Sequence, residues 1–100
     1  MLLLLAAAIT MPTCNGAADC EVKWGRAIRW VIAHNPTIEA QNDSSITTAE
    51  PLGKTNKYQV TRIPDGDGRY TLDLRLGCSP LRSCKRDDLK RDFAATVMAD

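Results

Sequence analysis

The four cysteines are the residues of this 100-residue chain with the most readily predicted chemistry. Cys78 and Cys84 flank a short segment containing Ser-Pro, which favours a turn, so we expect a disulfide between them in an oxidising compartment. Closing so small a ring contributes roughly 2 kcal/mol in the chain-entropy model. Cys20 is then left buried or free, unless it closes a loop of about 60 residues worth roughly 4 kcal/mol. If Cys14 survives processing, it has the same spacing to Cys20, so two small disulfide loops become possible.

Zinc, calcium and general catalysis are disfavoured by the spacing of the candidate ligands. No cysteine pair has the two- or four-residue separation typical of zinc sites. The stretch Asp65–Gly68 resembles the start of a calcium loop, but Arg69 and Leu76 stand where an EF-hand needs oxygen ligands. His34 stands alone near a predicted helix end, and Asp73 lies on a solvated strand face. We therefore expect no catalytic, metal or cofactor-binding residues and no enzyme.

The charge pattern divides the chain into a leader and one small domain. The 13 Lys and Arg nearly balance the 12 Asp and Glu, which gives no reason to expect a nucleic acid partner. Residues 1–18 carry no charged side chain, and the apolar run Met1–Met11 is typical of a signal peptide while being too short to span a bilayer. Small residues at Gly16–Ala18 predict cleavage after Ala18. We expect a signal peptide at 1–18, a single domain at 19–100, and a periplasmic or secreted protein.

Two alternatives to simple cleavage stay open at this stage. The leading segment is alternatively a buried N-terminal helix. Cys14 is alternatively a lipidation site, although the preceding Met11–Thr13 lacks the small residue that a lipoprotein signal places before its cysteine. Contact with a membrane is expected only if Cys14 is lipidated.

The remaining sequence predicts an α+β domain. Asp19 can cap a helix that begins at Cys20, carries an apolar stripe at helical spacing and ends at Asn35-Pro36. Alternation of apolar and polar residues predicts strands at 37–41, 46–49, 57–63 and 69–76, and a final helix is expected at 85–98. The simplest arrangement is an N-terminal helix, a four-stranded antiparallel sheet and a C-terminal helix, with both helices on one face of the sheet.

Two surfaces are candidates for contact with a partner. Trp30 lies on the flank of the first helix and, if exposed, is a plausible contact residue, because aromatic residues and arginines dominate binding hot spots. The outer face of the sheet is the second candidate, with Gln59, Thr61, Arg62, Thr71, Asp73 and Arg75 as its residues.

The strings WGRAIRWVIAHNP, ITTAEP and YQVTRIPDGDGRYTLDL, followed by two cysteines six positions apart, resemble a group of small exported Gram-negative bacterial proteins of unassigned function. The order of elements also looks like the TBP-like folds of some periplasmic domains. Neither resemblance implies catalytic residues. We therefore expect an exported module that binds an unidentified protein partner, such as an inhibitor or an immunity-type protein. A structural cell-envelope protein or lipoprotein without a ligand is the alternative, and a small hydrolase comes third.

Overall fold

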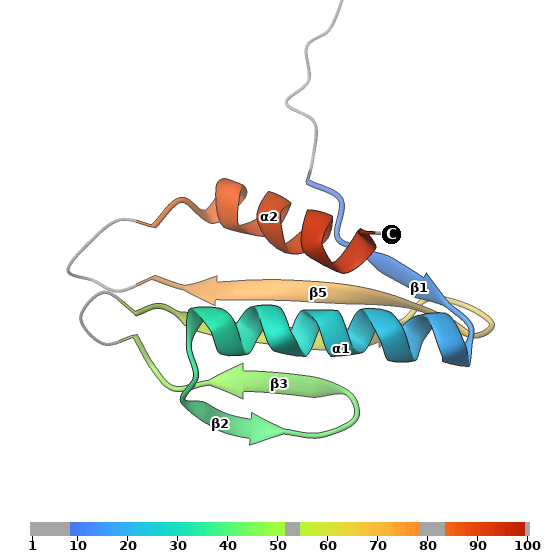
Figure 1. The fold of residues 1–100 in the computed structure, drawn as a ribbon, viewed down its shortest axis with the longest axis horizontal. Coiled ribbons are helices and arrows are strands. Elements are labelled where there is room, and N and C mark those ends of the chain that lie inside the picture. Colours follow the sequence, from blue (N-terminus) through green and yellow to red (C-terminus); the bar gives the residue numbers. More distant parts are fainter. Residues whose placement is uncertain (1–8, 52–54, 79–83, 100) are drawn as a thin grey trace, which may run out of the picture.

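The computed structural model describes residues 9–51, 55–78 and 84–99. Its elements, in chain order, are β1 (Thr13–Asn15), α1 (Ala17–His34), β2 (Ile38–Gln41), β3 (Ser45–Thr48), β4 (Lys57–Pro64), β5 (Arg69–Gly77) and α2 (Arg86–Met98). The strands form one antiparallel sheet in the order β1-β5-β4-β3-β2, and both helices lie on the same face of it (Figure 1). The predicted α+β architecture with two helices on one face is confirmed.

The predicted number of strands is wrong, because the structure has five and the sequence predicted four. The additional strand is β1, which pairs with β5 through Thr13 opposite Thr71 and Cys14 opposite Tyr70. Three residues are too few to show an alternating pattern, and they lie in the stretch assigned to the leader. The predicted leader boundary at Ala18 falls inside α1.

Helix α1 begins at Ala17, before the predicted start at Cys20. It ends at His34, as the helix-terminating pair Asn35-Pro36 predicted. Asp19 is therefore in the first turn instead of at the cap. Its carboxylate accepts hydrogen bonds from the Asn15 backbone N–H at 2.9 Å and from Lys23 Nζ at 3.1 Å. The backbone donor and then Lys23 hold the pKa of Asp19 below its usual value, because both favour the charged carboxylate.

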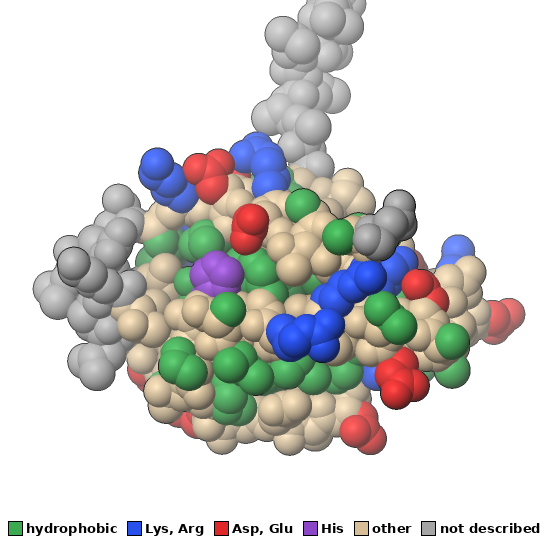
Figure 2. All heavy atoms as spheres, viewed as in Figure 1, with side chains coloured by type: hydrophobic (Ala, Val, Ile, Leu, Met, Phe, Trp, Pro, Cys, Tyr) green, Lys and Arg blue, Asp and Glu red, His purple; other side chains and the backbone are tan. Residues whose placement is uncertain are grey.

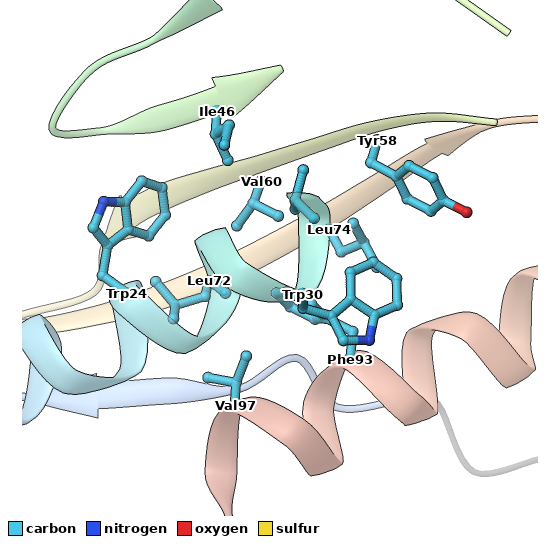
Figure 3. Packing of buried hydrophobic residues seen from close by; sticks show 11 residues of the cluster. Trp24, Trp30, Ile46, Tyr58, Val60, Leu72, Leu74, Phe93 and Val97 are labelled. Atoms are coloured by element: carbon cyan, nitrogen blue, oxygen red, sulfur yellow. The ribbon is translucent and has the colours of Figure 1, made fainter. Parts of the chain in front are cut away.

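The core fills the space between the helices and one face of the sheet. It consists of Trp24, Ala27, Trp30 and Val31 from α1, Ile46, Tyr58, Val60, Leu72 and Leu74 from the sheet, and Phe93 and Val97 from α2 (Figure 3). The strand residues in this cluster follow the predicted period of two. The alternation along each strand therefore decides which side chains stabilise the fold.

Trp30 belongs to the core and is only 5 % exposed, so it does not meet the condition under which it would be a contact residue. Its ring packs edge-on against Phe93 of α2, and its Nε1–H donates a hydrogen bond of 2.8 Å to Asp92. The stripe on α1 indicates the side that faces the sheet, but it carries no information about the flank that a second helix covers.

Both small cysteine loops are closed by disulfides. Cys78–Cys84 is confirmed and brackets the connection between β5 and α2. Cys20 is buried as expected, but it is bonded to Cys14, so it is not free. A thioether-linked lipid on Cys14 would exclude this disulfide, since each needs the same sulfur. No helix among the described residues is long and apolar enough to cross a membrane.

Candidate functional site

The face of the sheet turned away from the helices is mainly polar, and we call it the open face. Its residues alternate along each strand with the core residues and are Ser45, Thr47, Lys57, Gln59, Thr61, Ile63, Thr71, Asp73, Arg75 and Gly77. Threonine is favoured in strands because its branched side chain packs well on a pleated surface. Apart from Ile63 and Gly77, the open face is thus a set of polar side chains held in register by a hydrogen-bonded sheet.

The strand register brings Thr61 between Ser45 and Asp73, in the middle of the open face. In the next row, Gln59 lies opposite Arg75. Two of the predicted contact residues, Asp73 and Arg75, are therefore on this face as expected for the outer surface of the sheet.

Arg75 is the most prominent charged group of the open face, with 77 % of its side chain exposed. Its Nε donates to Asp73 Oδ2 at 3.2 Å, and the Asp73 side chain is 27 % exposed. A surface pair of this kind contributes about 0–1 kcal/mol to stability. Arg75 is consequently available for binding at little cost to the fold, and its guanidinium has further donors for a partner's carboxylate.

A shallow depression of about 210 Å³ marks one end of the open face. Lys57, Gln59, Arg75 and Gly77 line it, together with Leu76. Gly77 stands opposite Lys57, and a Cβ at Gly77 would lie 3.3 Å from the Lys57 Cβ, so the missing side chain leaves room there. Two cationic groups and one amide therefore border a hollow that admits the end of a side chain.

Lys57 is also held in an ion pair, with its Nζ 3.1 Å from Glu50 Oε1. Both cations beside the depression thus have one acidic neighbour each, Glu50 for Lys57 and Asp73 for Arg75. These contacts orient the cations without burying them.

Arg62 was predicted to lie on the outer face of the sheet with Asp73 and Arg75. This prediction is wrong, because the structure places Arg62 on the opposite face. It stands opposite Leu72, on the helix side of the sheet. Its guanidinium carbon is 4.8 Å from the centre of the Tyr70 ring and 5.5 Å from that of Trp24. Consecutive strand residues point to opposite faces, so Thr61 and Arg62 cannot share one surface. Arg62 closes an end of the core by stacking on aromatic rings.

His34 packs on the ring of Trp30 at the end of α1, with the two ring centres 3.8 Å apart. Its Nδ1 is 2.7 Å from the Trp30 carbonyl oxygen, and since that oxygen only accepts, the imidazole donates. Figure 2 shows the histidine half-buried among hydrophobic side chains on the helix side of the molecule. Within residues 9–51, 55–78 and 84–99, no group of three His, Cys, Asp or Glu is placed to hold a metal ion.

Lys57 and Gly77 are the residues of this site that sequence reasoning missed. Lys57 begins the strand predicted at 57–63, and Gly77 follows the strand predicted at 69–76. Only the register of β4 against β5 brings them opposite one another. No short-range pattern could have indicated this pairing.

Comparison of the chain with protein families, with curated proteins and with solved structures finds no match. The arrangement of the side chains is therefore the basis for the functional argument that follows.

Proposed function

We propose that this chain is an exported binding module of the periplasm or the extracellular medium, acting as an inhibitor or immunity-type protein without catalysis of its own. Two disulfides in so short a chain are typical of proteins that fold in an oxidising compartment. The open face is the contact surface in this proposal. The observation that carries it is the depression bordered by Lys57, Gln59 and Arg75 on the polar face of a hydrogen-bonded sheet.

The chemistry of the depression defines the partner. Lys57 and Arg75 supply positive charge, and Gln59 offers both a donor and an acceptor. A carboxylate from the partner can enter the hollow and take two parallel hydrogen bonds from the Arg75 guanidinium. The partner is accordingly a folded protein that presents an acidic side chain on a surface flat enough to lie against the sheet.

The size of the open face indicates how much of the contact area with a partner it can supply. The 8 residues of β4 extend for about 26 Å, and five strands span about 19 Å, which gives a face on the order of 500 Å². A stable complex buries about 800 Å² on each partner. The partner therefore also contacts surface beyond the open face. Within the face, Ile63 is 42 % exposed and offers an apolar contact at the end opposite the depression.

The test uses the oxidised chain as bait in three forms: wild type, Arg75→Glu and Arg29→Glu. Arg29 is exposed on α1, on the other side of the molecule, so Arg29→Glu makes the same change of charge away from the open face. We expect wild type and Arg29→Glu to capture one stoichiometric enzyme from a periplasmic extract and to inhibit it. Arg75→Glu should lose both effects.

The other outcomes assign the chain differently. Retention of a single enzyme by all three baits would contradict the open face as the contact surface. A chain that captures nothing and fractionates with the cell envelope would support the structural alternative. Turnover of a generic ester or glycan, lost on mutation of His34 or Asp73, would support the small hydrolase.

A further inference from the structure

The pair Asn15-Gly16 joins β1 to α1 and has a chemical reactivity of its own. The backbone nitrogen of a residue that follows asparagine can attack the carbonyl carbon of the asparagine side chain. Glycine hinders this attack least, because it has no Cβ. The fold itself favours glycine at position 16, since the φ of Gly16 is +86°. The turn into α1 therefore places the most reactive neighbour for an asparagine directly after Asn15.

Hydrogen bonds on both sides of this peptide keep its nitrogen from reacting. The Gly16 N–H donates to the Gly68 carbonyl at 2.8 Å, so the nitrogen is held away from the preceding side chain. Asn15 is paired with Arg69 of β5, and its own N–H donates to Asp19 Oδ2 at 2.9 Å. Attack on the side-chain carbonyl needs the peptide between Asn15 and Gly16 to rotate. The folded protein prevents that rotation as long as β1 stays in place.

The disulfide between Cys14 and Cys20 is the covalent link that keeps β1 in place. β1 has only 3 residues and lies at the edge of the sheet beside β5 (Figure 1). Local opening is easiest in such short terminal elements. The disulfide ties β1 to the start of α1, and both of its cysteines are buried. Asn15 and Gly16 lie within the ring that this bond closes.

We propose that Asn15 is a deamidation site that the Cys14–Cys20 disulfide keeps closed. A dithiol opens the disulfide: its two thiols become a disulfide, and Cys14 and Cys20 gain two electrons and two protons. The Gly16 nitrogen then bonds to the Asn15 Cγ and loses its proton, and the side-chain amide leaves as ammonia. Water opens the resulting five-membered ring at either carbonyl, which gives aspartate or isoaspartate.

The isoaspartate product makes the opening of β1 irreversible. Its main chain runs through the former side chain and is one methylene longer between Cys14 and Gly16. The strand pairing with β5 and the hydrogen bond from Gly16 to Gly68 then no longer fit the same register. This modification goes beyond the proposed function, since it is independent of what binds the open face.

The test measures the rate at which Asn15 loses its amide in the full chain with both disulfides formed. Peptide mass spectrometry detects the replacement of the amide by a hydroxyl group at neutral pH. The reduced chain in urea sets the maximum rate. Oxidised wild type should react at least about tenfold more slowly than that chain. Joint replacement of Cys14 and Cys20 by alanine should raise the rate towards the maximum.

Two controls separate local opening of β1 from a general loss of stability. Joint replacement of Cys78 and Cys84 by alanine removes a disulfide of the same sequence separation at another place in the fold. Val60→Ala weakens the core on β4, which is not adjacent to β1, and keeps both disulfides. Both variants should deamidate at close to the wild-type rate. All rates are compared at a temperature where circular dichroism shows each variant to be folded.

Wild type treated with a dithiol gives the same comparison without any substitution. Alkylation of the free thiols identifies which disulfide is open in each molecule, and deamidated Asn15 should occur only where Cys14 and Cys20 are free. Equal rates in oxidised wild type and in the unfolded chain would overturn the protection by the fold. Deamidation in molecules that retain the Cys14–Cys20 bond, or an equally fast reaction in Val60→Ala, would overturn the role of this disulfide.

Discussion

The two faces of the sheet are built from the same strands and have opposite physical roles. On the helix side, Val60, Leu72 and Leu74 are completely buried. On the open face, their neighbours Thr61 and Asp73 remain partly accessible. Because burial of apolar surface is the main source of stability, the helix side holds the fold together. The open face is thereby free to carry polar groups that serve binding.

Replacement of one residue on each face of β5 gives the largest contrast. Leu72→Ala should lower the free energy of unfolding by about 4 kcal/mol, because it opens a cavity in the core. Thr71→Ala, one residue away on the open face, should cost less than about 1 kcal/mol. Denaturant unfolding monitored by circular dichroism measures both. Equal losses would show that the open face also contributes to the core.

The two disulfides give the next contrast, because they close loops of the same sequence separation in different surroundings. Each should contribute about 2 kcal/mol by restricting the unfolded chain. Replacing Cys14 and Cys20 together by alanine should cost about 1 kcal/mol more, since both sulfurs are buried and their loss leaves a small cavity. The same double change at Cys78 and Cys84 is the control. A larger loss at Cys78 and Cys84 would contradict this account.

The third contrast is between two arginines, Arg62 on the helix side of the sheet and Arg75 on the open face. Arg62→Ala should lower stability by about 1 kcal/mol, because it removes the guanidinium from the rings of Trp24 and Tyr70. Arg75→Ala should leave the thermal midpoint almost unchanged, since its ion pair is on the surface. Thermal unfolding of the two variants side by side is the measurement. A stable Arg62→Ala variant would show that the stacking contributes nothing.

The smallest expected effect is that of Asp19, whose carboxylate accepts hydrogen bonds from the Asn15 backbone N–H and from Lys23 at the start of α1. Its pKa is lower in the folded protein than in the unfolded chain, so the charged carboxylate stabilises the fold above the unfolded value of about 3.9. That contribution is lost as the pH falls through the lowered pKa. Wild type should therefore exceed Asp19→Asn in thermal midpoint at pH 7 and match it in strong acid. A constant difference at every pH would exclude this origin.

Local patterns predicted the layers of the fold because they reflect burial directly. The alternation from Arg69 to Leu76 predicts which side of β5 faces the helices, and Asn35-Pro36 predicts where α1 ends. The strand β1 was missed because its pairing with β5 depends on a contact distant in sequence. The burial of Trp30 stayed open for a similar reason, since side chains that cover it lie on α2.

The candidate site was only partly predictable. Asp73 and Arg75 are on the open face as expected, whereas Arg62 is excluded from it by the alternation of the strand itself. Lys57 and Gly77 join the site only through the register between β4 and β5. A register of this kind is fixed by the whole sheet and its turns, so single-strand patterns do not reveal it.

Mapping of the contact surface by NMR tests the central claim most directly. The isotope-labelled chain is titrated with the enzyme that it captures, and changes in the backbone amide signals are followed residue by residue. The account predicts that the changes concentrate on the open-face strands, at Lys57, Gln59, Thr61, Asp73 and Arg75, with the outer side of α1 unaffected. Changes confined to the helices would contradict it.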